Sequence, residues 1–348
     1  MSDLPNALPV ARTPDPSDAP SLRWGVVGTG WIADKFVTAL QKHSSQQVVA
    51  VGSRTQGSAA SFAQRLGIER AYGSYEALAA DPEVDVVYVA TPHNSHLRHA
   101  LMALRAGKHT VVEKPLALNA AQGQQIADEA RRRGLFCMEA YWTVFLPKFD
   151  VLRQLLESDT AGEINAVVAD FGEWFPSSHR IHRPELAGGP MLDLGTYLVS
   201  FVLEVIGSPD SIHAWGTSTE TGVLGQTAMI MESGQRQAIL YATILANTPT
   251  AATIAGSKAT ITIDGPFYQP GCFTVAAADG SAMLRYEEPR IAHGGLHFQA
   301  AEVARRIAAG EAESPMRPLS ASINLLRVMD EVRRQTNDRY QDEDPARA

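Results

Sequence analysis

The sequence predicts an α/β protein of two domains: an N-terminal parallel sheet with helices, and a C-terminal α+β domain with a large, mostly antiparallel open sheet. Three observations lead to this prediction. The chain has 348 residues, and a single hydrophobic core usually stops growing at about 250–300 residues. Strand-like and helix-like segments alternate in the first half, which is typical of parallel strands joined by helical crossovers. Short strand-like segments separated by tight turns fill the second half, which is typical of antiparallel pairing.

The elements of the first half are read from apolar runs and from the glycines that end them. Strands are predicted at residues 22–27, 47–51, 84–90, 110–112 and 135–139. Helices are predicted at residues 33–43, 59–66, 95–106 and 120–133, the last three ending before glycines. The run 84–90 is mostly β-branched or aromatic, as expected for a strand that is buried on both faces.

The second half begins with two helices and ends with two more. The first pair is predicted at residues 147–158 and after Gly195, and the last pair at 298–309 and 320–335. Between them, strands are predicted at residues 164–175, 212–217, 228–231, 237–243, 251–255, 260–263 and 273–277. The resulting division is a disordered tail at 1–20, a dinucleotide-binding domain at 21–140, a substrate-binding and oligomerisation domain at 141–336, and a tail at 337–348.

Composition excludes several classes of function. The chain carries 30 basic and 38 acidic residues, a net charge of −8, which argues against nucleic-acid binding. Its two cysteines cannot form a disulfide framework, which favours a reducing compartment. No apolar run reaches the ~18–20 residues of a membrane span. Prolines and Asp3 interrupt any signal-peptide core, so we expect a cytoplasmic protein that does not bind membranes.

A glycine turn follows the first predicted strand. Gly28-Thr29-Gly30-Trp31-Ile32-Ala33 fits the pattern G-x-G-x-x-[GA] and opens the first predicted helix, which is the context of a Rossmann dinucleotide site. Gly28 allows the tight turn, Gly30 lets a pyrophosphate approach the backbone, and Ala33 lets helix and strand pack closely. The helix N-terminus then offers free amides to the phosphates. The alternative is an ordinary glycine-rich turn.

The end of the second strand indicates which dinucleotide is bound. An Asp or Glu there would accept hydrogen bonds from the ribose hydroxyls and favour NAD. The sequence instead has Val51-Gly52-Ser53-Arg54-Thr55, without a carboxylate. Ser53 can donate to a phosphate and Arg54 supplies a cation, so an adenosine 2′-phosphate and therefore NADP is predicted. The alternative is that Arg54 occupies a solvated loop.

Polar residues follow two further strands at their carboxyl ends, where ligands bind in open α/β sheets. Thr91-Pro92-His93-Asn94-Ser95-His96 follows one strand, and Glu113-Lys114-Pro115 follows the next. A lysine just beyond a buried strand is partly desolvated and can take part in proton transfer. The alternative is a surface lysine, since most lysines are exposed.

These motifs together resemble the glucose–fructose oxidoreductase, inositol dehydrogenase and MocA family. Gly188-Gly189-Pro190-Met191-Leu192-Asp193-Leu194-Gly195-Thr196-Tyr197 is similar to that family's second-domain signature. The resemblance covers residues 22–335. It is greatest to the branch of dimeric dihydrodiol dehydrogenases and NADP-dependent D-xylose dehydrogenases, of which Met138-Glu139-Ala140-Tyr141-Trp142 and the segment Glu313-Ser314-Pro315-Met316 are typical.

The resemblance implies a role for each candidate residue. Lys114 is implied as the catalytic lysine and Tyr197 as the acid/base, since a nearby ammonium stabilises a phenolate. Asp193, one helical turn before Tyr197, is implied to orient Lys114 or bind a sugar hydroxyl; the alternative is a helix N-cap. The residues implied to bind the cofactor are Gly28, Thr29, Gly30, Trp31, Ile32, Ser53, Arg54, Thr91, His93, Asn94, His96, Glu113 and Lys114.

Substrate contacts are implied for His96, Asp193, Trp142 and Phe171, the two aromatic rings as an apolar wall. The alternatives are a local hydrogen bond for His96 and simple core packing for the two rings. Pairs of histidines three residues apart occur by chance among 10 histidines, and no metal is predicted. The active site is expected in a cleft between the two domains.

The resulting prediction is an NADP-dependent oxidoreductase that transfers hydride between a sugar or cyclic polyol carbon and the nicotinamide. C1 of an aldopyranose such as D-xylose is expected as the reacting carbon. The alternatives are a trans-dihydrodiol dehydrogenase, a reductase of α-dicarbonyls or deoxy-sugars, and, in another class, a non-catalytic NADP-binding sugar sensor. The resemblance also implies a homodimer formed through the C-terminal sheet, because an open sheet face must be covered.

Overall fold

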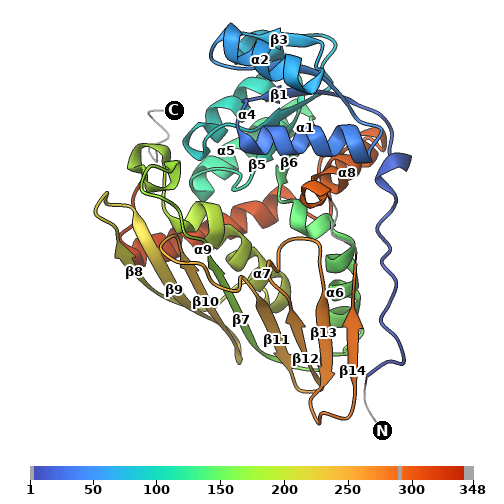
Figure 1. Cartoon of the computed structure of the whole chain (residues 1–348), viewed down its shortest axis with the longest axis vertical. Helices are drawn as coiled ribbons and strands as arrows, with labels where there is room; N and C mark the ends of the chain where they lie inside the picture. The colour runs from blue at the N-terminus through green and yellow to red at the C-terminus, as the bar shows by residue number, and fades with distance from the viewer. Residues whose placement is uncertain (1–3, 289–291, 341–348) are drawn as a thin grey trace. The chain divides into compact units, whose positions relative to one another are not determined.

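The computed structural model describes residues 4–288 and 292–340, and the chain divides into two compact units (Figure 1). The parallel-sheet unit comprises Pro14–Phe145 and Ala292–Leu326. Within the described residues, the open-sheet unit comprises 4–13, 146–288 and 327–340. The expected continuous division near residue 140 is therefore corrected: residues 292–326 return to the first unit. Helical periodicity shows that a helix buries one face, but not which sheet it covers.

The parallel-sheet unit holds six strands in the order β3-β2-β1-β4-β5-β6, all paired in parallel. The strands are β1 (Arg23–Val27), β2 (Gln47–Gly52), β3 (Arg70–Tyr72), β4 (Val86–Val89), β5 (His109–Glu113) and β6 (Cys137–Ala140). The helices are α1 (Trp31–His43), α2 (Gln56–Leu66), α3 (Tyr75–Ala79), α4 (His96–Arg105), α5 (Ala120–Arg133) and α8 (Leu296–Ala308). This sheet confirms the predicted Rossmann fold. The sequence analysis missed β3 and α3, which are too short to show periodicity.

The strand order of this sheet determines where a ligand can bind. β1 lies between β2 and β4, so the chain crosses to opposite sides of β1 after its first three strands. Ligands of doubly wound sheets bind at this reversal point, beyond the carboxyl ends of the strands. The turn after β1, the turn after β2 and the loop after β4 therefore share one edge of the sheet.

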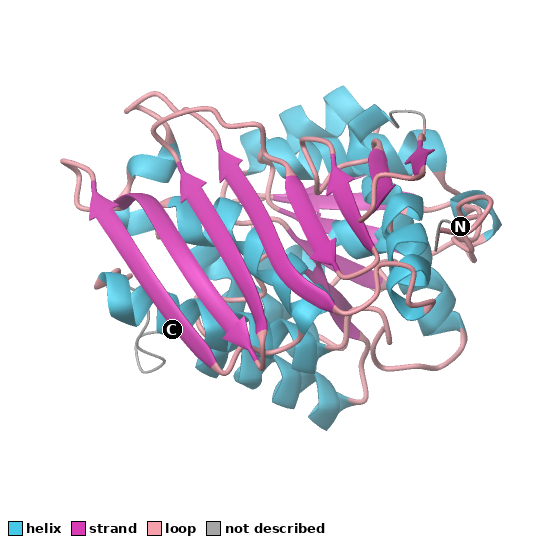
Figure 2. Ribbon diagram, turned by 90° about the horizontal axis from the view of Figure 1, so that it is seen from below, coloured by secondary structure: helices cyan, strands magenta, loops and turns pink. Residues whose placement is uncertain are grey.

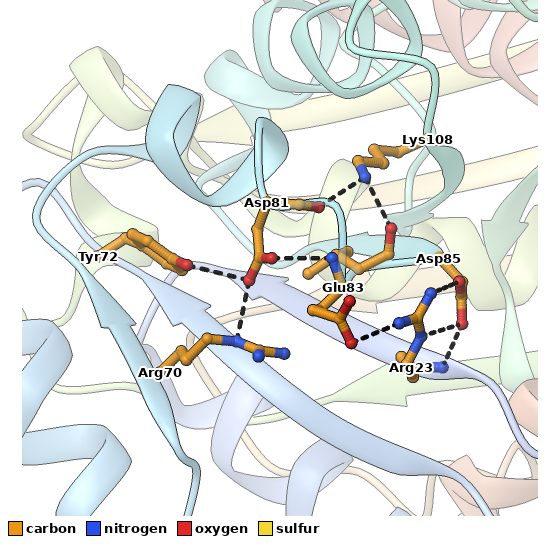
Figure 3. A network of polar contacts seen from close by, with 8 residues as sticks. Arg23, Arg70, Tyr72, Asp81, Glu83, Asp85 and Lys108 are labelled. Carbon is orange, nitrogen blue, oxygen red and sulfur yellow. Dashed lines mark hydrogen bonds and ion pairs between the residues drawn. The ribbon is translucent and has the colours of Figure 1, made fainter.

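The opposite edge of this sheet is closed by ionic contacts (Figure 3). Arg23 at the start of β1 pairs with Asp85 at 2.7 Å, and Asp81 accepts a hydrogen bond of 3.0 Å from the hydroxyl of Tyr72. Lys108, just before β5, donates to the backbone carbonyl of Asp81 at 2.7 Å. Arg23, Asp85 and Lys108 lie at the amino ends of β1, β4 and β5, so their contacts stabilise the sheet away from the ligand-binding edge, whereas Tyr72 is the last residue of β3.

The open-sheet unit contains an eight-stranded sheet in the order β14-β13-β12-β11-β7-β10-β9-β8. Its strands are β7 (Ile164–Gly172), β8 (Ser211–Ser218), β9 (Leu224–Ser233), β10 (Arg236–Thr243), β11 (Ala252–Gly256), β12 (Ala259–Ile263), β13 (Phe273–Ala277) and β14 (Met283–Tyr286). Only β7 and β10 pair in parallel, so the prediction of a mostly antiparallel sheet is confirmed. The sequence analysis missed β14, which lies at the edge.

Helices cover one face of this sheet. α6 (Pro147–Glu157), α7 (Thr196–Ile206) and the second half of α9 (Leu319–Thr336) belong to the unit, and α7 contacts β7 and β10. Phe171 on β7 is buried against this side, whereas its neighbour Val168 faces the other way and is exposed. Figure 2 shows the strands with helices behind them and the other face without a covering helix.

The tail predicted to be disordered, residues 1–20, is partly ordered within the described residues, which corrects that expectation. Pro16–Asp18 form a short 3₁₀-helix, because proline is tolerated in the first turn of a helix and Asp15 caps it. Arg12 donates to the carboxylate of Asp150 on α6, with its backbone N–H 2.7 Å from that group. At the other end of the chain, Tyr340 is buried under the guanidinium of Arg333, 3.8 Å from its ring centroid. Residues 1–3 and 341–348 lie outside the described part.

Among the residues that the structure describes, one helical stretch is long and apolar enough to cross a membrane, although the sequence analysis found no such run. It is Pro184–Ile206, with 23 residues and a mean hydropathy of 1.4. In the structure, 83% of its apolar window is buried inside the protein. The core helix of a soluble protein meets the same criteria, so this stretch is weak evidence for a membrane span.

Candidate functional site

The glycine turn after β1 is shaped by two different constraints. Gly28 has a φ of +109°, and a Cβ there would lie 2.5 Å from the carbonyl oxygen of Ala90, so the fold itself requires glycine. Gly30 is different, because a Cβ on it would meet no protein atom within 4 Å. The open space above Gly30 lies at the N-terminus of α1, where backbone N–H groups attract anions.

The neighbouring residues of the turn form the edge of this space. The side chain of Trp31 is 72% exposed, and Ile32 behind it is half-buried. The Thr29 hydroxyl lies 3.5 Å from that of Ser53, which joins the turn after β1 to the end of β2. The structure therefore places Thr29 and Ser53 together, as expected for two groups that contact one ligand.

The loop between β2 and α2 carries an exposed cation, the guanidinium of Arg54. The Ser53 backbone N–H donates to the carbonyl of Tyr72 at 3.0 Å, which fixes the end of β2, and the side chain of Arg54 is exposed. Thr55 caps α2 by accepting from the N–H of Ser58 at 3.3 Å. Arg54 thus lies between an anchored strand end and a helix N-terminus, both of which hold its backbone in place.

The loop after β4 holds two of its histidines in the interior. His96 is fully buried, with Nδ1 2.8 Å from the carbonyl oxygen of Pro115 and Nε2 2.9 Å from that of Thr91. Burial lowers its pKa, so the ring is neutral and donates to one carbonyl at a time. This corrects the expectation that His96 contacts cofactor or substrate: its side chain binds backbone instead. His93 packs edge-on against His96, and Asn94 beside it is partly exposed.

Three buried side chains hold the backbone around Lys114. The Lys114 N–H donates to Glu113 at 3.1 Å, the carbonyl of Pro115 faces His96, and the Leu116 N–H donates to Glu139 at 2.8 Å. Three successive residues are therefore fixed by side chains. Lys114 itself is half-buried, as expected for a lysine just beyond a central strand.

Glu113 combines burial with a hydrogen-bonding partner. The hydroxyl of Tyr88 on β4 donates to its carboxylate, and the Lys114 backbone occupies the other oxygen. Burial raises the pKa of Glu113 to about 7, against the lowering effects of Tyr88 and of the Lys114 charge. This carboxyl therefore changes charge near neutral pH, directly beside the candidate lysine.

In the open-sheet unit, Asp193 lies on a π-helical turn, Met191–Gly195, that runs into α7. Arg180 approaches its carboxylate with two nitrogens, at 2.8 and 3.2 Å. No side-chain cap bond is found at the start of this turn, so the alternative of N-cap duty is not supported. A π-helical turn is frequently found at functional sites, since it changes which side chains face the same side.

Tyr197 lies on the first turn of α7 within a cluster of aromatic rings. Its ring centroid is 4.2 Å from that of Tyr268 and 5.9 Å from that of Phe171, and the last two rings are stacked at 4.9 Å. Tyr197 is 6% exposed. The structure thus brings the predicted acid/base residue and the predicted wall residue Phe171 together, and it adds Tyr268.

A buried lysine holds Tyr268 in this cluster. Lys148 on α6 is fully buried, and its ammonium donates to the carbonyl of Phe267 at 2.9 Å and also to that of Gln269. These carbonyls flank Tyr268 on both sides. Burial lowers the pKa of Lys148 to about 8.

Trp142 belongs to the parallel-sheet unit and lies in the 3₁₀-helix Trp142–Phe145. It is 6% exposed, and a Cβ on Gly294 would lie 3.1 Å from its ring. Packing within its own unit therefore accounts for at least part of its burial, as the core alternative proposed.

Sequence reasoning missed the partners of the candidate residues. Arg180, Tyr268, Lys148 and Arg317 each bind a group that lies far away along the chain or in an irregular loop. Only Arg317 had a signal, because it directly follows the segment Glu313-Ser314-Pro315-Met316 that resembles one branch of the family. Long-range pairing leaves no periodicity in a sequence, so such partners emerge only from the fold.

The residues at this edge of the parallel sheet fit a dinucleotide. Gly30 leaves free the volume that a pyrophosphate needs beside the N-terminus of α1, and no carboxylate follows β2. Gly28, Thr29 and Gly30 would hold the phosphates, and Ser53 and Arg54 would hold the adenosine ribose. A bound nicotinamide dinucleotide supplies a hydride acceptor or donor.

Comparisons with known proteins agree with this arrangement. Residues 22–141 match the family model of an oxidoreductase family with an NAD-binding Rossmann fold, and residues 149–262 match the GFO/IDH/MocA C-terminal domain. The trans-1,2-dihydrobenzene-1,2-diol dehydrogenase of Xenopus tropicalis is 37% identical over 326 residues, which cover 91% of this chain and 99% of the relative. The enzyme of that name from Homo sapiens is 35% identical over 327 residues, covering 90% and 96%.

Solved structures share the fold. KijD10, a 3-ketoreductase from Actinomadura kijaniata in complex with NADP and TDP-benzene, superposes with a TM-score of 0.81 at 24% identity, covering 92% of this chain and 99% of that one. A levoglucosan dehydrogenase in complex with NADH and levoglucosan superposes with a TM-score of 0.80 at 18% identity, covering 91% and 98%. At these identities the likeness establishes the fold alone.

Proposed function

Because the chain belongs to the GFO/IDH/MocA oxidoreductase family, we propose that it is an NADP-dependent dehydrogenase acting on a hydroxyl-bearing carbon of a cyclic diol or sugar. The observation that carries this proposal is the position of Tyr197. Its ring packs in an aromatic cluster with Phe171 and Tyr268. Four residues before it lies Asp193, whose carboxylate is paired with Arg180. An acid/base group beside an apolar wall suits a ring that carries a reacting hydroxyl.

The roles of the residues follow from their chemistry. In the oxidation direction, the Tyr197 oxygen accepts the proton of the substrate hydroxyl while the hydride leaves the same carbon. The Lys114 ammonium hydrogen-bonds the substrate oxygen and stabilises the negative charge that develops on it. Asp193, held by Arg180, orients a polar partner or accepts a hydrogen bond from a second hydroxyl. Phe171 and Tyr268 contact the face of the ring.

The first substrate candidate is a trans-dihydrodiol. Relatives 35–38% identical over about nine-tenths of the chain carry that activity in their names. The flat rings of Phe171 and Tyr268, stacked at 4.9 Å, favour a planar apolar ring. D-xylose, oxidised at C1, is the second candidate, because the Asp193–Arg180 pair offers charged partners to the additional hydroxyls of a sugar.

A turnover assay tests this proposal. Purified protein is mixed either with NADP or NAD and trans-1,2-dihydrobenzene-1,2-diol or D-xylose, or with NADPH and an α-dicarbonyl, and the absorbance of the reduced cofactor is followed as it rises or falls. We expect turnover with the dihydrodiol and NADP. If calorimetry shows that NADP and a sugar bind but no member of the panel turns over, the protein is a sensor and the enzyme proposal fails.

The preference for NADP rests on Arg54. We expect Arg54→Ala to weaken NADP binding about 10–100-fold, since a charge-assisted hydrogen bond to a phosphate contributes about 1.5–3 kcal/mol. NAD binding should change less than about threefold, because NAD lacks the 2′-phosphate. Calorimetric titration of both cofactors measures the difference. Arg65→Ala, an exposed arginine on α2, the helix that follows the Arg54 loop, is the matched control; equal losses for NADP and NAD would refute the 2′-phosphate role.

The uncovered face of the open sheet supports a homodimer. One row of side chains crosses all eight strands on this face, and Val168, Ile239 and Trp215 on the face are 48%, 54% and 60% exposed. The row consists of His213, Ile230, Ile239, Val168, Thr253, Thr262, Thr274 and Arg285. Six of these eight side chains are β-branched and Arg285, at one end of the row, is the charged one; flat surfaces rich in such side chains pack well against a second sheet. We therefore propose a second copy of the chain as the partner.

The dimer is tested by placing a charge at the centre of this row. Ile239→Lys would bury an unpaired ammonium in the interface, so we expect the dimer to dissociate into monomers at micromolar concentration. Light scattering after size-exclusion chromatography measures the mass. Val10→Lys, which changes another exposed β-branched residue away from the sheet, should leave the dimer intact. A wild-type monomer, or an Ile239→Lys variant that stays dimeric, would contradict the proposed interface.

A further inference from the structure

Glu139 is a buried carboxylate that makes no contact with solvent. It lies on β6, the neighbour of the strand that carries Glu113, and it is fully buried. One of its oxygens accepts the Leu116 N–H at 2.8 Å. The other accepts two hydrogen bonds from Arg317, at 2.9 and 2.6 Å, and one from the Ser322 hydroxyl at 2.7 Å. Four donors therefore converge on one carboxylate.

Arg317 comes from a distant part of the chain and compensates this charge. It is 4% exposed, and its guanidinium lies 4.4 Å from the ring centroid of Tyr141. It sits in the segment between α8 and α9, which is also held by Glu302, whose carboxylate accepts the Ser314 hydroxyl at 2.7 Å. The ion pair between Arg317 and Glu139 thus joins two stretches that are separate in the sequence: the one around Glu139 and the one that precedes Arg317.

The Glu139 carboxylate is also connected to Lys114. Leu116 is the second residue after Lys114, and Pro115 between them is buried and faces His96. A shift of the Leu116 N–H would therefore be passed through a short, immobilised segment to the Lys114 Cα. Misplacement of a catalytic group by about 1 Å can lower the rate about 100-fold. The hydrogen bond between the Leu116 N–H and Glu139 can therefore affect the rate strongly.

We infer that Glu139 is a positioning residue for Lys114, acting through the Leu116 N–H, and that Arg317 compensates the buried charge of its carboxylate. The catalytic half of this inference rests on the proposed function; the structural half, the immobilised Lys114 segment, does not. The function of the ion pair is then to fix the direction from which the ammonium of Lys114 approaches the substrate oxygen.

Two double variants separate the hydrogen bond from the ion pair. Both Glu139→Gln/Arg317→Met and Glu139→Met/Arg317→Met remove the charges, which avoids leaving one buried charge unpaired. Only the first retains an oxygen that can accept the Leu116 N–H. Arg23→Met/Asp85→Asn, which removes an ion pair at the opposite edge of the same sheet, is the control.

The melting temperature of each protein is determined, and two further measurements are then made on it. Hydrogen–deuterium exchange of peptides that contain Leu116 reports the immobilised segment, and kcat and KM for NADP report its consequence. For Glu139→Met/Arg317→Met we expect at least tenfold faster exchange and a fall in kcat of about 10–100-fold, with KM for NADP within about threefold. Glu139→Gln/Arg317→Met and the control should stay within about threefold of wild type in both.

The outcomes are decisive in both directions. If both double variants exchange and turn over like wild type, the carboxylate acts only in packing and the inference is overturned. If both lose kcat equally, the hydrogen bond to the Leu116 N–H does not position Lys114, and the inference is overturned as well. If wild type turns over no substrate, the proposed function fails, while exchange at Leu116 still decides the structural half. If Glu139→Met/Arg317→Met does not fold, Ser322→Ala decides: faster Leu116 exchange with lower kcat supports the inference, and no change overturns it.

Discussion

Replacing Tyr197 with phenylalanine is expected to lower kcat by about 10²–10⁴-fold, the range that a positioned general acid/base contributes. The substitution removes one oxygen and keeps the ring that packs 4.2 Å from Tyr268. The aromatic cluster and the melting temperature should therefore change little. Because the residues expected to hold the phosphates and the adenosine ribose, Gly28 to Gly30, Ser53 and Arg54, are unchanged, NADP affinity should also be retained.

The pH dependence distinguishes proton transfer from packing for this variant. Wild-type kcat in the oxidation direction should rise with pH as the phenol ionises, and the Tyr197→Phe variant should lose that rising limb. Steady-state kinetics across a pH series, with calorimetric titration of NADP, measures both effects. Tyr286→Phe removes a phenol that donates to Glu288 at 2.9 Å and serves as the control. Retention of kcat within tenfold in Tyr197→Phe would reject the acid/base role.

Replacing Lys114 with methionine is expected to lower kcat by about 10²–10³-fold, comparable to the loss of one preorganised donor at a developing oxyanion. Methionine has a similar length and leaves the backbone contacts of this segment intact, since those involve the N–H groups of Lys114 and Leu116 and the carbonyl of Pro115. The effect should therefore come from the missing ammonium.

Two comparisons make this expectation specific. Lys108→Met, in the same unit, removes an ammonium that donates to two backbone carbonyls, so it should lower the melting temperature and leave kcat unchanged. The double variant Lys114→Met/Tyr197→Phe should lose little more than Tyr197→Phe alone, because groups that act on one proton are not additive. Steady-state kinetics of wild type, of each single variant at Lys114 and Tyr197 and of the double variant tests this. Multiplied losses in the double variant would show that the two residues act independently.

The position of the cofactor cradle could be predicted from the sequence because its signals are local. Gly28 and Gly30 lie in one turn, and the strand before them and the helix after them are each visible as a run of apolar residues. The structure sharpened their difference: Gly28 is required by a backbone oxygen 2.5 Å away, whereas Gly30 leaves open space. The sequence analysis missed short elements such as β3 (Arg70–Tyr72), because three residues are too few to show a periodic pattern of apolar residues.

A hydrogen bond to a residue far along the chain explains the largest correction within the site. The sequence places His96 beside the carboxyl end of a strand, which is where ligand-binding residues gather. Whether its ring faces a ligand or the backbone depends on Pro115, which is 19 positions away, and no pattern in the sequence records that contact. The same holds for the N-terminal segment, whose prolines suggested disorder although Arg12 finds a carboxylate on α6.

The chain's fold class, its glycine turn and the place of Lys114 just beyond a buried strand follow from neighbouring residues, because periodicity and turn chemistry act over a few positions. The catalytic candidates Asp193 and Tyr197 follow instead from the resemblance to a known family. The partners of those candidates arise only when distant segments are packed together. Arg317 lies 178 positions from Glu139, and Lys148 lies 119 from Phe267, yet each pair shares a hydrogen bond or ion pair. Burial strengthens such contacts by excluding water, and burial is a property of the folded chain.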